Sequence, residues 1–228
     1  MIHRILLACA LVVVSCAQTM QAQDLLQYRE FRLGATLTSV ATLTAVTPAA
    51  VTVLHQRPAL LQDLEWRPRY VSRESAAIAP DPVDRMVFSF YNDQLYKVVV
   101  DYEPRRTEGM AQADLMAAIS ATYGVALKPA LHANPPEVQY GDPDLLLATW
   151  GNAESTLALF RAAYPVRYRL VVQAAQLATL AKTAAAESVR LDLREAPQRE
   201  LERQQKQTDA DLAAAEEAKR VNLPGFRP

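Results

Sequence analysis

Cysteine is almost absent from this sequence. Its two cysteines, Cys9 and Cys16, lie in the first 16 of 228 residues. The remainder therefore has no disulfide to stabilise it and no thiol for catalysis or metal binding. A chain of this length can bury enough apolar surface to be stable without such cross-links.

Histidine is nearly as scarce, and no recognised motif of enzyme chemistry is present. His55 and His132 are the only histidines besides His3, and no two of these have the spacing of metal ligands. The sequence contains no G-x-S-x-G motif of serine hydrolases. Asp142 and Asp144 lack the further oxygen ligands of a calcium loop, so they are interpreted as a turn with an aspartate cap. These absences predict no catalytic residue, no metal and no cofactor.

Charge of one sign is also lacking. The 24 basic and 25 acidic residues give a formal net charge of -1. A balance of this kind excludes general, non-specific electrostatic binding to nucleic acid or to anionic lipid. With 50% hydrophobic and 21% charged residues, the composition is typical of a globular protein.

The first residues have the layout of a bacterial-type secretory signal peptide. Arg4 provides a positive start, Ile5 to Val14 form an uncharged apolar run, and small residues follow. The run has about half the ~20 residues that a membrane-spanning helix needs. Residues 1–22 are therefore predicted to be a signal, and the mature protein is expected in the periplasm or outside the cell.

The cleavage point has three candidates. Val13-Val14-Ser15-Cys16 resembles a lipobox, in which Cys16 would be lipidated and anchor the protein to the outer membrane. Ordinary cleavage after Ala17 or after Ala22 would release a free protein instead. A membrane contact is expected only through the lipid.

Residues 23–104 are predicted to form a first αβ unit. Gly34 precedes a helix capped by Thr36, with Leu37, Val40, Ala41 and Leu43 on its inward side. Runs rich in leucine, aromatic and β-branched residues predict strands over Val51–Gln56 and Leu61–Tyr70.

A hairpin is the clearest element of this unit. Residues 86–91 and 94–100 flank Asn92-Asp93, and both turn residues tolerate positive backbone angles. The two-residue turn predicts that Phe90 opposes Leu95 and that Met86 opposes Val99. Replacing the turn with Asn-Gly is expected to be neutral or stabilising. The predicted core face is Met86, Phe88, Phe90, Leu95 and Val99.

Residues 105–173 are predicted to form a second αβ unit. A helix follows Gly109, ends near Gly124, and has Leu115, Met116, Ile119 and Tyr123 on its inward side. Three strands are predicted at Leu145–Trp150, Ser155–Phe160 and Arg167–Val172.

The two units align as a weak internal repeat. Gly34 and Gly109 each open an amphipathic helix that several strands follow, and Val40 and Leu115 each lie six residues beyond their glycine. This pattern resembles the repeat of β-lactamase-inhibitor-type proteins and of small outer-membrane assembly lipoproteins. The resemblance implies an α+β fold, with an antiparallel sheet covered by helices on one face, in relatives that bind other proteins. A chance pairing of two αβ segments remains the alternative.

The C-terminal part is predicted to be helical. Residues 174–196 carry a stripe that can dock on the domain, formed by Leu177, Leu180, Ala181, Ala184 and Leu191. Pro197 is expected to interrupt or restart the helix. Residues 197–228 form a charged arm and an extended end. The arm's large apolar residues before residue 221 are Leu201 and Leu212, which is too few for a coiled coil. The acid-first spacing of four predicts the pairs Glu195–Arg199, Glu202–Lys206 and Glu216–Arg220.

These observations favour an exported, non-enzymatic protein that binds another envelope protein. An envelope enzyme with an unrecognised site and a module for small molecules or glycans are the alternatives. A basic patch near the second predicted strand and the exposed leucines of the arm are the candidate partner surface: Arg57, Trp66, Arg67, Arg69, Leu201 and Leu212.

Overall fold

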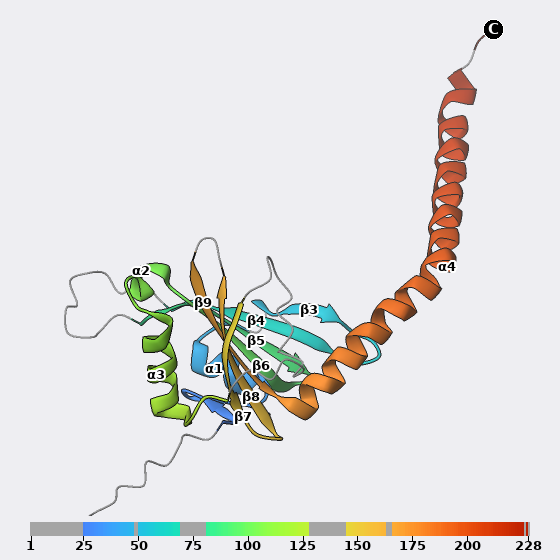
Figure 1. The fold of residues 1–228 in the computed structure, drawn as a ribbon. Helices are drawn as coiled ribbons and strands as arrows, with labels where there is room; N and C mark the ends of the chain where they lie inside the picture. Colours follow the sequence, from blue (N-terminus) through green and yellow to red (C-terminus); the bar gives the residue numbers. More distant parts are fainter. Residues whose placement is uncertain are drawn as a thin grey trace, which may run out of the picture.

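The protein is an α+β domain with a long helix that leaves it (Figure 1). The computed structural model describes residues 25–47, 50–68, 81–127, 145–162, 166–225 and 227. Seven antiparallel strands form one sheet in the order β3-β4-β5-β6-β9-β8-β7, and β1 and β2 form a separate two-stranded sheet. The predicted fold class is confirmed.

The described residues of the first unit contain six strands and one α-helix. Their bounds are β1 (Gln27–Tyr28), β2 (Phe31–Arg32), α1 (Leu37–Thr44), β3 (Thr52–His55), β4 (Leu61–Trp66), β5 (Val83–Tyr91) and β6 (Gln94–Tyr102). The sequence pattern did not predict β1 and β2, because two-residue strands are too short to show a period.

The described residues after β6 contain four helical segments and three strands. They are α2 (Pro104–Thr107), α3 (Gln112–Tyr123), β7 (Leu145–Gly151), β8 (Ser155–Ala162), β9 (Arg167–Ala174), α4 (Ala175–Asn222) and the short 3₁₀ helix η2 (Leu223–Gly225). All three strands predicted here are present.

The two glycine–helix–strand segments share one sheet. Their last strands, β6 and β9, pair with each other at its centre, so the meanders β4-β5-β6 and β9-β8-β7 run outward in opposite directions. Val40 and Leu115, which the repeat aligns, are both buried in the main core.

The main core lies on one face of the sheet. Opposed residues of neighbouring strands form rows across it, such as Leu64, Phe88, Val98, Val172 and Leu157. The buried residues of α1, α3 and β1-β2 belong to the same cluster, so these elements cover this face. The opposite face carries a smaller cluster of Ala158, Phe160 and Val171.

Two leucines that the sequence pattern predicts on the inward side of a helix are exposed in the structure. Leu43 of α1 is 54% exposed, whereas Leu37, Val40, Ala41 and Thr44 are buried. A helix advances about 100° per residue and the buried stripe of α1 is narrow, so Leu43 lies outside it. In α4, Leu180 is likewise exposed, while its neighbour Ala181 is buried.

The hairpin of β5 and β6 has the predicted turn but a different register. Asn92 and Asp93 have φ of 46° and 67°, and Phe90 opposes Leu95 as predicted. One residue further on, a β-bulge shifts the pairing, so Met86 opposes Val100 and not Val99. The extra residue on β6 reverses which of its side chains beyond the bulge face the core. The core face of β6 is therefore Leu95, Val98 and Val100.

The side chains of Asn92 and Asp93 also accept hydrogen bonds from segments that are distant in sequence. Asn92 Oδ1 accepts a hydrogen bond from the Leu60 backbone N–H at 2.9 Å. Asp93 Oδ1 accepts one from the Leu37 N–H at 3.0 Å, in the first turn of α1. A carboxylate there satisfies a helix-terminal donor that would otherwise lack a partner.

This contact reverses the expectation for an Asn-Gly turn. Asp93→Gly relieves the positive φ but removes the acceptor for Leu37, and loss of such a cap costs about 1 kcal/mol. We expect the glycine variant to be about 0.5 to 1 kcal/mol less stable in urea unfolding. Asp93→Asn, which keeps an oxygen acceptor and tolerates this backbone, should stay close to wild type. A glycine variant as stable as wild type would show that the cap contributes nothing.

Helix α4 runs without a break through Pro197, so the predicted interruption is wrong. Proline lacks the N–H for the Leu193 carbonyl and its ring crowds that carbonyl, which bends a helix. Figure 1 shows that α4 changes direction part-way along its length. The Arg199 guanidinium donates to the Asp192 backbone carbonyl at 3.0 Å, one residue before the carbonyl that the proline leaves without its helical donor.

Candidate partner-binding surfaces

The first candidate surface is the junction between edge strand β3 and helix α4. Arg57 donates two hydrogen bonds to the Glu195 carboxylate, at 3.0 and 2.7 Å. Nearby, His55 Nδ1 and the Ser188 hydroxyl lie 2.9 Å apart. Ser188 is buried, whereas the Arg57–Glu195 pair is exposed to solvent. These contacts fix the direction in which α4 leaves the domain.

A small cavity lies at this junction. Its volume is about 230 Å³, below the ~300 Å³ at which most ligand pockets begin. The residues that line it come from β3, the segment after it and α4: Leu54, His55, Gln56, Arg57, Ser188, Leu191, Asp192 and Arg199. Both of its arginines are already paired with carboxylates of α4. The cavity therefore has the character of a structural joint.

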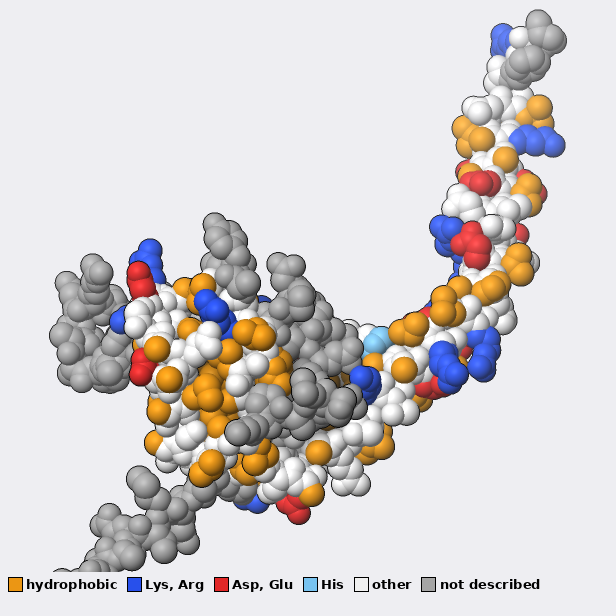
Figure 2. All heavy atoms as spheres, viewed as in Figure 1, with side chains coloured by type: hydrophobic (Ala, Val, Ile, Leu, Met, Phe, Trp, Pro, Cys, Tyr) orange, Lys and Arg blue, Asp and Glu red, His pale blue; other side chains and the backbone are white. Residues whose placement is uncertain are grey.

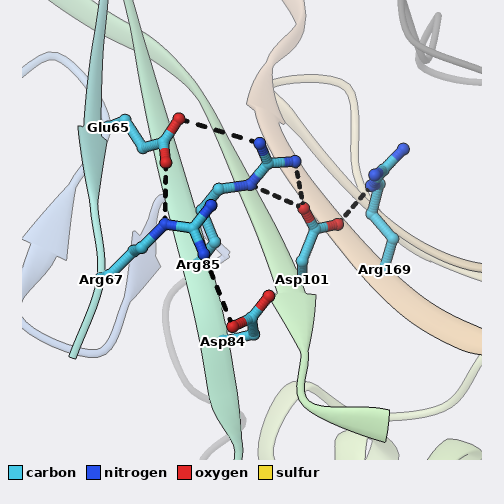
Figure 3. A network of polar contacts seen from close by, with 6 residues as sticks. All are labelled: Glu65, Arg67, Asp84, Arg85, Asp101 and Arg169. Atoms are coloured by element: carbon cyan, nitrogen blue, oxygen red, sulfur yellow. Dashed lines mark hydrogen bonds and ion pairs between the residues drawn. The ribbon is translucent and has the colours of Figure 1, made fainter. Parts of the chain in front are cut away.

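The second candidate surface is a network of charges on the sheet face opposite the main core (Figure 3). Arg67 contacts Glu65 at 3.0 Å and Asp84 at 3.7 Å. Arg85 contacts Asp101 at 2.6 Å and Glu65 at 3.8 Å. Arg67, which the sequence assigns to the candidate partner surface, and Arg85 beside it are thus paired with acidic neighbours.

Asp101 is the centre of this network. Its carboxylate lies between Arg85 and Arg169, which each approach to 2.6 Å, and its side chain is only 12% exposed. Burial by itself would raise the pKa of Asp101, but the hydrogen bonds from Arg169 and Arg85 outweigh it and hold the pKa below its usual value. The arrangement joins β5, β6 and β9 and is structural.

Asp63 and Glu65 share this face of β4, because residues two apart on a strand point to the same side, yet they differ in environment. Glu65 is ion-paired with Arg67 and Arg85. Asp63 is half-buried, its Oδ1 has no hydrogen-bond partner among the residues that the structure describes, and burial raises its pKa. Glu65 therefore belongs to the ion-paired network, whereas Asp63 makes no ion pair with a described residue.

The other predicted site residues are scattered. Trp66 is half-buried and packs against the main core, so it is not an open aromatic surface. Cys16, Arg69, His132, Asp142 and Asp144 lie outside the described residues. Among the residues that the structure describes, no group of three histidine, cysteine or acidic side chains could hold a metal ion.

The third candidate surface is the distal part of α4, residues 197–222, which we call the arm. Every residue from Leu201 to Asn222 is exposed. Leu201 and Leu212 are 67% and 60% exposed. Figure 2 shows isolated hydrophobic side chains among charges of both signs along this helix.

The ion pairs of α4 differ from those that the spacing predicted. Arginines pair with the acid three residues earlier, as in Glu187–Arg190, Glu200–Arg203 and Glu217–Arg220. Glu195 binds Arg57 of the domain, and Arg199 binds Asp192. The three predicted i,i+4 pairs are not made. Spacings of three and four both bring side chains together on a helix, so sequence alone does not choose between them.

Removal of the arm should leave a folded domain. We expect residues 24–196 to melt within a few degrees of residues 24–228 in a calorimetric scan, because the exposed arm buries little apolar surface against the domain. This variant keeps Ser188 and Glu195, which hold α4 at the junction. A deeper truncation after Ala174 should instead lower the melting temperature strongly, since it removes the buried Ala181 and Ala184. Aggregation of the 24–196 variant would show that the arm belongs to the core.

Comparison with family models, with curated proteins and with solved structures finds no match to this chain. Within the described residues, no helix is both long and apolar enough to span a membrane.

Proposed function

We propose that the protein is an exported, non-enzymatic binding or structural protein of the bacterial cell envelope, and that its arm engages another envelope protein. The observation that carries this proposal is the continuous helix of 48 residues whose last turns are exposed on all sides. The domain supplies a rigid base for that helix through Arg57, His55 and the buried turns of α4.

The physical cost of an isolated helix supports this role. Helical segments without tertiary contacts are only marginally stable in water, because ordering the backbone opposes them. Alanines and the i,i+3 ion pairs offset part of that cost. An exposed helix with a few large apolar side chains is also the usual element that docks into a groove of a partner protein.

The placement of the arm suits a reach across the envelope. At about 1.5 Å per residue, α4 is roughly 70 Å long. β1, the first described element, and the end of α4 lie at opposite ends of the molecule (Figure 1). With the N-terminal side anchored through Cys16 or free after signal cleavage, the arm extends away from it.

Site-specific crosslinking in living cells tests the proposal. A photoreactive amino acid at Leu201 or Leu212 should give an adduct with one envelope protein, identified by mass spectrometry. The control position is Leu43, which is similarly exposed but lies on α1. The same adduct at Leu43, or no adduct at either arm position, would contradict binding through the arm.

The export step has its own readout. Mass spectrometry of the protein from fractionated cells should find a mature N-terminus between Cys16 and Asp24, and lipidation would be visible as added mass on Cys16. Retention of Met1 on cytoplasmic protein would contradict export.

A further inference from the structure

We infer that the arm binds a basic helix, one that carries arginine or lysine beside an apolar seam. The inference rests on the proposed function and names the chemical class of the partner. The juxtaposition that supports it is a line of acidic side chains next to the exposed leucines of the arm.

Helix geometry places these acids on one line. Glu195, Glu202, Asp209 and Glu216 are spaced seven residues apart. A spacing of seven shifts a position around an α-helix by only about 20°, so the four side chains follow one edge of α4. We call this edge the acidic line.

The exposed leucines lie next to the acidic line. Leu201 and Leu212 are eleven residues apart, which on a helix also differs by only about 20°. With Thr208 and Ala215 between and beyond them, they form a narrow strip of uncharged side chains along the arm. A partner helix seated on this strip would have its flank beside the acidic line.

Most of the acidic line has no basic partner within the described chain. No arginine or lysine of the described residues pairs with Glu202, Asp209 or Glu216, although Lys206 and Arg220 are close in sequence. Arg220 pairs with Glu217 instead. Glu202 accepts only a 3.4 Å hydrogen bond from Gln198. These three carboxylates are therefore available for charges from outside.

The domain itself shows how the acidic line binds a cation. Its first member, Glu195, receives the bidentate hydrogen bonds of Arg57. A guanidinium matches the carboxylate fork with two parallel bonds. A partner with basic residues at intervals of about one heptad, roughly 10 Å along the helix, would continue this interface onto Glu202, Asp209 and Glu216.

The same charges disfavour a second copy of this chain as the occupant. If two arms packed through their leucine strips in antiparallel fashion, the acidic line of one would lie beside that of the other. Like charges at the flanks of a helical seam are unfavourable and select against that pairing.

The test uses two synthetic helical peptides of about three heptads with leucine in the seam. One carries arginine at the flanking positions and the other carries glutamate. Fluorescence anisotropy measures their binding to residues 24–228. We expect the arginine peptide to bind and the glutamate peptide not to bind, with binding that weakens as salt is added.

A charge-matched pair of variants assigns the effect to the acidic line. The triple variant Glu202→Gln, Asp209→Asn and Glu216→Gln should bind the arginine peptide roughly tenfold more weakly, as expected for the loss of three exposed ion pairs. The control is Glu187→Gln, Glu200→Gln and Glu217→Gln, which removes the same charge from acids already paired with arginine. It should bind within about twofold of wild type.

Several results would overturn the inference. These are equal binding of both peptides, no binding of either, unchanged binding by the triple variant, or sedimentation showing that the wild-type chain pairs with itself through the arm. The cellular adduct at Leu201 separates this inference from the proposed function. An adduct whose yield is undiminished in the triple variant refutes the basic partner while the role of the arm stands, and the absence of any arm adduct refutes that role.

Discussion

Phe88→Ala is expected to lower the free energy of unfolding by about 4 kcal/mol. Phe88 is fully buried, and its ring lies 4.5 Å from that of Phe31, which covers it from β2. Truncation removes the apolar contacts of a whole ring and leaves a cavity in a close-packed core. In a domain of this size the melting temperature should fall by roughly 10 °C.

The matched control is Leu43→Ala on α1, where the side chain is 54% exposed. An exposed apolar residue loses little on truncation, so its unfolding free energy should change by less than about 0.5 kcal/mol. Similar melting curves for Phe88→Ala and wild type would contradict the core face assigned to β5.

The second large effect is expected for Asp101→Asn, at about 3 kcal/mol. The substitution leaves Arg85 and Arg169 facing a neutral amide where two hydrogen-bonded ion pairs existed. Removing one partner of a buried ion pair is strongly destabilising, because the desolvation of the arginines is then offset by fewer charge-assisted hydrogen bonds. Equilibrium unfolding in urea at neutral pH measures the loss.

The effect of Asp101→Asn should depend on pH in one direction. The pKa of Asp101 is lower in the folded protein than its usual value, so its stabilising contribution is present above about pH 4, the usual range of a free aspartate. That contribution is lost as the pH falls through the folded-state pKa. The difference between wild type and variant should therefore narrow below about pH 4.

Asp84→Asn is the control, because it removes the same charge from a more exposed position of the same network. Asp84 belongs to the same network, but its side chain is 45% exposed and its contact with Arg67 is 3.7 Å. Exposed pairs of this kind contribute less than about 1 kcal/mol. Equal losses for Asp84→Asn and Asp101→Asn would indicate a general effect of net charge.

The elements of the fold were accessible from local patterns. Alternation predicted the strands, Thr36 and Gly124 marked helix ends, and Asn92-Asp93 marked the hairpin turn. These signals depend only on residues close in sequence, so they can be recognised without the tertiary structure. The register beyond the turn was not accessible, because the bulge between the turn and Val98 leaves no mark in the pattern of side chains.

The candidate site was predicted only in part. Exposure of Leu201 and Leu212 followed from the polar composition of the arm. The partner of Arg57 did not, since Glu195 is 138 residues away. The heptad spacing of the acidic line was visible in the sequence. Only the structure shows that Glu202, Asp209 and Glu216 have no basic partner among the described residues.

The sequence by itself determined the balance of charge, the dependence on a disulfide-free core, and the order of the longer helices and strands, and it predicts export. Each of these depends on composition or on neighbours within a few residues. The tertiary structure decided that β6 pairs with β9, that Asp101 lies between two arginines, and that α4 passes through Pro197. Pairings of this kind join residues far apart in sequence, and their free energies depend on burial and geometry that a linear pattern does not contain.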